Sequence, residues 1–259
     1  MKSFFPTYYL KTALHAVTPG GFGYYRRLRK HQNPAYNHER DKHPVRTRHN
    51  RTSGWKDTVD VLHKREYENY DEYRTHQVQK YQEILQTQGG FGNYTVFTWR
   101  QKFFHRFQYL SKFIPLNATI VCLGARQGTE VEVLWDMGFK NAYGLDLNPG
   151  PDNPYVRPGD FMHLQEKDNS VDVLYTNCVD HAFDLDSFLA EQCRVLKPNG
   201  FGLYDLPLYS GTRKPGAFEA IGWNSEEEII SRLKKSFKTV LHTRTEKKWM
   251  WILLQNPVK

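Results

Sequence analysis

The stretch VCLGARQGTE, residues 121–130, decides the fold of this chain. An apolar run from Ile120 to Leu123 has the length of a buried strand and stops at Gly124. A second glycine, Gly128, follows one turn later, and a helical pattern begins after it. Glycine at these two places lets the chain turn directly off a strand and lets the next helix begin close to the sheet. Backbone N–H groups at such a helix start can face a polar ligand.

Strand-like and helix-like segments alternate from this turn to the end of the chain. The expected strands are 120–123, 142–147, 171–176, 201–206, 238–243 and 249–254, and the expected helices are 129–137, 185–196 and 225–237. Alternation of this kind predicts a parallel sheet with helices on both faces. The last two strands flank the turn RTEKK and form a hairpin. We therefore predict a Rossmann-like, doubly wound α/β fold whose mostly parallel sheet ends in an antiparallel β-hairpin.

The N-terminal quarter of the chain has a different composition. Residues 1–65 contain 14 Lys/Arg against 4 Asp/Glu, whereas the rest of the 259 residues contains 22 against 24. Residues 1–60 have weak periodicity and are rich in His, Arg, Asn, Pro and Gly, which predicts a basic, loop-rich arm. Basic and aromatic residues together could contact nucleic acid. We favour a solvated arm, because the segment shows no recognisable nucleic-acid-binding fold.

A helical lead-in is expected between this arm and the α/β domain, over residues 61–115. The helical pattern starts at Trp55 and runs to Gln88, with Tyr67, Tyr70 and Tyr73 on one stripe that is typical of packing. The segment GGFGN (89–93) breaks it, and residues 95–114 form a second amphipathic helix. The α/β domain then occupies residues 116–259.

Cysteine usage and hydropathy indicate the compartment. The three cysteines form no CxxC pair, which fits a reducing compartment and argues against a zinc framework. No apolar run approaches the ~20 residues that span a bilayer. We expect a cytoplasmic protein without a transmembrane segment.

A carboxylate at the end of the second α/β strand indicates the cofactor. Asp146 follows Gly124 by 22 residues, where an acid can accept both hydroxyls of a ribose. A glycine turn and a distant acid together indicate an adenosine-containing cofactor. Arg126 occupies the middle glycine position of a dinucleotide motif, and its side chain would obstruct a pyrophosphate. This favours S-adenosylmethionine over a dinucleotide.

The motifs GDF, DNSVDVLYTN and RVLKPNG follow the glycine turn in a familiar order and spacing. With IVCLGARQGTE and AYGLDLNPG, they make residues 118–255 resemble a class I S-adenosylmethionine-dependent methyltransferase of the broad methyltransferase-domain type. The resemblance implies a cofactor site in which the glycine turn holds the methionine part, the acid binds the ribose, and later loops surround the adenine and the methyl group. The implied residues for the methionine part are Gly124, Ala125, Arg126 and Gly128, and the implied residue for the ribose is Asp146. Those for the adenine are Leu147, Asp160 and Phe161, and Asn177 lies next to the methyl group.

Two positions depart from the family's pattern. Cys122 replaces an acid that helps orient the cofactor's ammonium end, and Ala125-Arg126 replace the usual cysteine and glycine. Arg126 could instead offer a positive group to the cofactor's carboxylate. An inactive methyltransferase fold that serves in binding or assembly therefore remains an alternative.

Catalytic candidates must follow the fourth and fifth strands of the expected sheet. TNCVDHAFD offers Asp180 and His181, and YDLPLYSGTR offers Asp205, Tyr209 and Arg213. His181 is the expected base because its ordinary pKa lies near neutrality. The alternative is a structural or cofactor-side role for the acid–His pair. Asp180, His181 and Asp205 could also form a divalent-ion site, but nothing in the sequence brings them together, and we predict no metal.

The acceptor is predicted less directly than the cofactor. YENYDEYRTHQ resembles the segment before methyltransferase domains associated with polysaccharide synthesis, which implies O-methylation of a sugar, a glycan or another small hydroxyl acceptor. The second hypothesis is an RNA methyltransferase that binds RNA through residues 1–65.

Overall fold

A seven-stranded sheet forms the centre of the computed structural model, which describes residues 55–57, 62–88, 93–150, 152–208, 216–246 and 249–259. The strand order is β5-β4-β3-β6-β7-β10-β9. The strands are β3 (Ile120–Leu123), β4 (Ala142–Asp146), β5 (Val156–Pro158), β6 (Val171–Thr176), β7 (Leu196–Pro207), β9 (Phe237–Glu246) and β10 (Trp249–Pro257). The first five in this order are parallel, and β10 pairs antiparallel with both β7 and β9. The predicted fold is confirmed.

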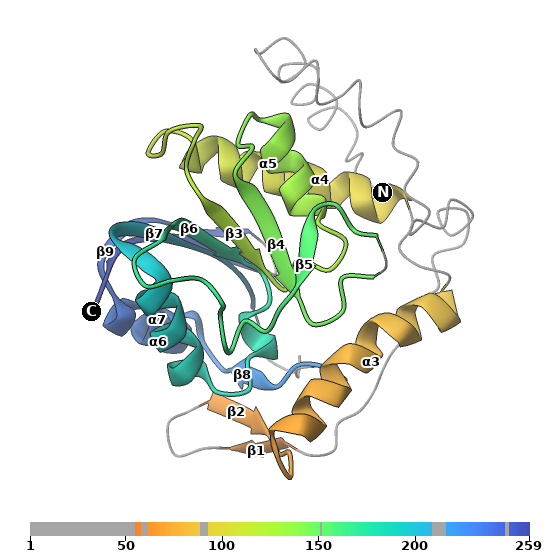
Figure 1. Cartoon of the computed structure of the whole chain (residues 1–259). Helices are drawn as coiled ribbons and strands as arrows, with labels where there is room; N and C mark the ends of the chain where they lie inside the picture. The colour runs from red at the N-terminus through yellow and green to blue at the C-terminus, as the bar shows by residue number, and fades with distance from the viewer. Residues whose placement is uncertain (1–54, 58–61, 89–92, 151, 209–215, 247–248) are drawn as a thin grey trace, which may run out of the picture.

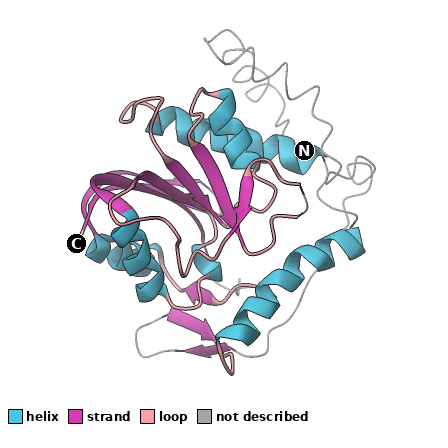
Figure 2. Cartoon of the chain, in the orientation of Figure 1, coloured by secondary structure: helices cyan, strands magenta, loops and turns pink. Residues whose placement is uncertain are grey.

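Helices cover both faces of this sheet (Figures 1 and 2). On one face lie α4 (Asn93–Leu110) and α5 (Thr129–Asp136), and on the other lie α6 (Leu185–Val195) and α7 (Glu226–Ser236). Alternate residues of β3 face the two layers, because successive side chains of a strand point to opposite sides. Cys122 packs with Phe107 of α4, and Leu123 packs in the cluster that contains Phe188 of α6. The sheet is therefore doubly wound.

A smaller sheet was missed in the sequence. The helical pattern expected from Trp55 is wrong at residues 55–57 and 62–69: β1 (Trp55–Asp57) and β2 (Leu62–Arg65) are strands, and α3 (Tyr70–Gln88) begins only after them. β2 pairs with β1 and with the distant β8 (Ile221–Trp223). Arg65 fixes this pairing by donating from Nε to the Glu219 carbonyl at 2.9 Å and from a terminal nitrogen to the Gly216 carbonyl at 2.8 Å. The local pattern could not reveal a partner more than 150 residues away.

The helix ends follow the local signals more closely. α7 begins after Ser225, whose hydroxyl accepts a hydrogen bond from the Glu228 N–H at 3.3 Å, as its cap position predicts. α6 ends at Val195, next to the predicted KPNG stop, and β7 starts at once at Leu196. β7 is therefore longer than the expected strand 201–206.

The helix α3 crosses the region beyond the carboxyl ends of the parallel strands (Figure 1). It is tied there by Tyr73, whose hydroxyl donates to the His181 carbonyl at 2.9 Å. In the described part of the chain, no helix combines the length and apolar character needed to cross a membrane. Residues 1–54 of the basic arm, together with Tyr209 and Arg213, lie outside the described residues.

Candidate active site

The turn between β3 and α5 has the tight geometry that its glycines predict. Gly124, Arg126 and Gly128 all have left-handed backbones, with φ of 69°, 44° and 80°. Gly124 also lies so close to the loop after β6 that a Cβ there would come within 2.9 Å of Cys178 Sγ. Arg126 adopts a conformation that glycine tolerates and a long side chain disfavours. A strained residue at a cavity wall points to a functional reason for the arginine.

Asp146 ends β4 directly opposite this turn. One oxygen of its carboxylate accepts the Arg126 N–H at 2.9 Å, and the other accepts the Asn148 N–H at 2.8 Å. The acid thus fixes the glycine turn and its own loop at the same time. Each oxygen keeps a further lone pair, which is what the predicted ribose contact requires.

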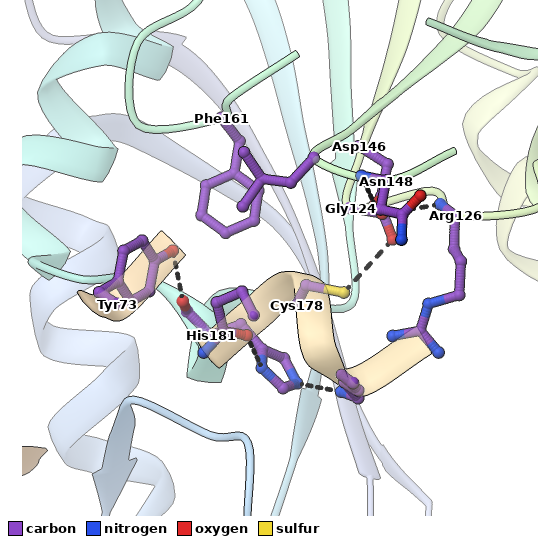
Figure 3. A pocket seen from close by; sticks show the side chains of 11 residues that line it. Tyr73, Gly124, Arg126, Asp146, Asn148, Phe161, Cys178 and His181 are labelled. Carbon is purple, nitrogen blue, oxygen red and sulfur yellow. Dashed lines mark hydrogen bonds between the residues drawn. The ribbon is translucent and has the colours of Figure 1, made fainter. Parts of the chain in front are cut away.

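A cavity of about 50 Å³ lies between the turn, the end of β4 and helix α3 (Figure 3). Gly124, Arg126, Asp146, Leu147 and Phe161, all predicted for the cofactor, line it together with Asn148, Cys178, His181 and the α3 residues Tyr73, Gln77 and Lys80. The structure therefore brings five of the nine predicted cofactor residues to one place.

Asp160 lies just outside this cavity. Its carboxylate accepts hydrogen bonds from the Tyr70 hydroxyl at 2.7 Å and from the Met162 N–H at 2.9 Å. The Asp160 side chain thereby holds the start of α3 and caps its own loop. Its predicted contact with the adenine stays a prediction.

A larger cavity of about 290 Å³ adjoins the first. The two share Gly124 and the side chains of Lys80, Arg126, Cys178 and His181 as a common wall. Its other lining residues are Trp99, Phe103, Ala125, Gln127, Thr129, Glu130, Asn177, Asp180, Pro207, Glu219 and Trp249. Gly128, the last predicted cofactor residue, has no room for a side chain, because a Cβ would lie 2.5 Å from Tyr155 Cβ.

His181 is buried, and both of its ring nitrogens are engaged (Figure 3). Nδ1 lies 2.9 Å from the Phe218 carbonyl and 3.0 Å from Gln77 Oε1, so this nitrogen carries the proton. Nε2 lies 2.7 Å from Lys80 Nζ, from which it accepts a hydrogen bond. Burial holds the pKa of His181 well below its ordinary value, and the positive charges of Lys80 and Arg126 lower it further. The imidazole is therefore neutral and acts as an acceptor for Lys80.

Lys80, Glu219 and Glu130 are site residues that sequence reasoning missed. Burial lowers the pKa of the Lys80 ammonium, with a further contribution from Arg126. Desolvation raises the pKa of the Glu130 carboxyl to about 8. Lys80 lies one helical turn after Gln77, on the stripe that begins with the α3 tyrosines, and this periodicity is the one signal that could have found it.

Asp205, a catalytic candidate from the sequence, lies outside both cavities. Its side chain is fully buried in β7, where Arg106 Nε lies 3.1 Å away, Lys102 Nζ 3.3 Å away and the Tyr175 hydroxyl 2.9 Å away. The idea of a divalent-ion site made from Asp180, His181 and Asp205 is therefore wrong, because Asp205 is committed to a buried ion-pair cluster.

Glu219, instead of Asp205, is the third potential metal ligand beside Asp180 and His181. Asp180, His181 and Glu219 bring ligand atoms within 4.8 Å of one another. However, the His181 nitrogen on this side accepts from Lys80 Nζ. A divalent cation would have to displace the ammonium group, so these residues fit a lysine better than a metal.

Comparisons with known proteins agree with this geometry. A family model described as a methyltransferase domain matches residues 121–203, from β3 into β7. The chain contains a class I methyltransferase domain. Its cofactor is S-adenosylmethionine, the methyl donor of this class. No curated protein matches the chain in sequence.

Solved structures share the fold of this methyltransferase domain. A Burkholderia thailandensis 1,6-didemethyltoxoflavin-N1-methyltransferase with bound 1,6-didemethyltoxoflavin and S-adenosylhomocysteine has a TM-score of 0.57 at 12% identity, covering 80% of this chain and all of that one. A chain from the "Complex between the Haloferax volcanii Trm112 methyltransferase activator and the putative methyltransferase" has a TM-score of 0.53 at 17% identity, covering 68% of this chain and 97% of that one. Likeness at such low identity shows the fold alone.

Proposed function

We propose that this chain transfers a methyl group from S-adenosylmethionine to a hydroxyl of a sugar, a glycan or a similarly small polar acceptor. The observation that carries the proposal is the composition of the larger cavity. Phe103 and Trp249 give it aromatic walls, and Asp180 and Glu219 give it carboxylates. Aromatic faces pack against the C–H faces of a sugar ring, while carboxylates accept hydrogen bonds from its hydroxyls.

The cofactor would lie across both cavities, along the common wall. In this arrangement Gly124, Ala125 and Arg126 surround the methionine part, Asp146 binds the ribose, and Leu147 and Phe161 contact the adenine. Gly128 and Asp160, which line neither cavity, would complete the turn and the adenine side. Asn177 lies beside the methyl group, in the larger cavity. The left-handed turn packs tightly against Cys178 and Tyr155, and Asp146 closes it by accepting the Arg126 N–H.

The bound cofactor supplies a sulfonium methyl group, and the chain's residues must align the acceptor and remove its proton. Asp180 is buried at the cavity wall, where its carboxylate takes the hydroxyl proton. Lys80 stabilises the negative charge that develops on the oxygen. His181 serves catalysis through Lys80, because its Nε2 already accepts from that ammonium group.

A methyl-transfer assay with labelled S-adenosylmethionine tests this proposal. The acceptors should include free sugars, oligosaccharides, nucleotide sugars, amines and RNA. We expect label in an alkali-stable methyl ether of a sugar, and we expect Asp180→Asn to lower turnover by roughly 10²–10⁴-fold. Label on an amine would contradict the proposal. Label on RNA, with RNA binding that weakens steeply as salt rises, would establish the alternative based on residues 1–65.

A further inference from the structure

Glu130 is a buried acid in the first turn of α5, where its own backbone N–H donates to it. It is the second residue of α5, is 4% exposed, and lines the larger cavity beside Ala125 and Gln127. Within the residues that the structure describes, its carboxylate forms no hydrogen bond or ion pair with another side chain. A buried carboxylate is retained at a cost in stability unless a cation or a donor compensates it.

The groups around Glu130 compensate its burial only in part. Burial is the main cause that raises the pKa of Glu130 to about 8, and the charge of Asp146 at the end of β4 adds to the rise. The backbone N–H of Glu130, then Arg126 of the turn and Lys102 of α4, lower this pKa, but by less than burial raises it. From β3, Cys122 faces the acid as a thiol, and the charge of Glu130 raises the pKa of that thiol further. The carboxyl group is therefore largely protonated at neutral pH in the free protein.

We propose that Glu130 binds the ammonium group at the amino-acid end of the cofactor, and that it gives up its proton when the cofactor binds. The inference rests on the cofactor site of the proposed function. The glycine turn ends two residues before Glu130, so the acid lies where the methionine part of the cofactor would end. Arg126, on the same turn, provides the matching positive group for the cofactor's carboxylate.

An ammonium group next to Glu130 favours the ionised carboxylate. Cofactor binding below pH 8 should therefore release a proton to the buffer. The other titratable or charged groups that line the cavity are Lys80, Arg126, Cys178, Asp180, His181 and Glu219. Because they lie around the common wall and the proposed acceptor site, a variant at Glu130 alone separates its contribution from theirs.

Calorimetry on the full chain tests this with two ligands, S-adenosylhomocysteine and 5′-methylthioadenosine, which lacks the amino-acid part. Titrations in buffers of different ionisation enthalpy measure the protons released. For the wild type at pH 7, we expect close to one proton released with S-adenosylhomocysteine and none with methylthioadenosine. Glu130→Gln should lose this release and weaken S-adenosylhomocysteine binding by roughly 10- to 100-fold, the range for hydrogen bonds to charged groups. Its affinity for methylthioadenosine should stay within about two-fold of the wild type.

The exposed Glu227 of α7 provides a matched control, since Glu227→Gln makes the same carboxyl-to-amide change outside the cavity lining. It should change the binding of neither ligand. A Glu130→Gln variant that binds both ligands as the wild type does would overturn the inference. Equal weakening of both ligands would also overturn it, because the acid would then shape the whole site. If the wild type binds neither ligand, the proposed cofactor site itself is wrong.

Discussion

Lys80 and His181 lie 101 residues apart and are joined by a 2.7 Å hydrogen bond from Nζ to Nε2. This bond connects helix α3 to the short helix η2 (Val179–His181) that follows β6. Tyr73 and Gln77 of α3 bind the backbone carbonyl and the ring of the same histidine. The helix over the site is therefore held in place by the residue that the sequence indicates as the base.

Replacing His181 distinguishes a positioning role from general-base catalysis. We expect His181→Ala to lower the free energy of unfolding by about 1–3 kcal/mol, because Lys80 and the Phe218 carbonyl each lose a buried partner. Single-turnover rates, measured on cofactor-saturated enzyme, should fall less than those of Asp180→Asn. An unchanged stability combined with a 10²–10⁴-fold slower turnover would instead identify His181 as the base.

The neutral state of His181 makes stability depend on pH. Its pKa in the folded protein lies well below the value near 6.5 expected for the unfolded chain. Between these two values the unfolded chain binds more protons, so stability falls as the pH drops below about 6.5. We expect urea unfolding midpoints to decrease from pH 7 to pH 5, and to decrease less in His181→Gln. Parallel pH profiles for the two proteins would show that another group is responsible.

Glu130 has the opposite effect on stability in the cofactor-free protein. Its pKa is about 8 in the folded chain and near 4.5 in the unfolded chain, so its contribution is complete below pH 4.5 and is lost as pH rises through 8. We expect Glu130→Gln to raise the melting temperature above pH 8, with the gain shrinking towards pH 5. Thermal unfolding across this range measures the difference. A variant less stable than the wild type at pH 9 would mean that the ionised carboxylate has a partner.

Asp205 serves stability, and its replacement should show this. The side chain is fully buried and is surrounded by Arg106, Lys102 and Tyr175. Asp205→Ala leaves buried positive charge uncompensated, and we expect a loss of about 3–5 kcal/mol in the free energy of unfolding. Denaturant titration measures the loss. A folded Asp205→Ala variant of wild-type stability would show that the ion pairs contribute nothing net.

Local sequence patterns correctly predicted strand bounds and helix caps that depend on neighbouring residues alone. β3 and β6 begin and end at the predicted residues, and Ser225 caps α7 as its position predicts. β1 and β2 were missed because their pairing depends on β8, which lies far along the chain.

In the site, too, residues with a local sequence signal were predicted, and residues placed by tertiary packing were missed. The glycine turn and Asp146 have their own local signals, and the structure brings them together. Lys80, Glu130 and Glu219 reach the cavity only through the packing of α3, α5 and the loop before β8, and a polar residue on a helix gives no sign of burial. Asp205 shows the converse, since a polar residue within a strand looks the same whether it faces a ligand or an internal arginine.

The central claim is that S-adenosylmethionine binds at the turn between β3 and α5 and at the end of β4. Calorimetric titration of S-adenosylhomocysteine into the wild type, Asp146→Asn and Asp146→Ala tests it most directly. We predict binding by the wild type and a loss of about 1–3 kcal/mol in Asp146→Ala, since hydrogen bonds to a charged group are lost. Absence of binding by the folded wild type, or equal affinity in all three proteins, would contradict the account.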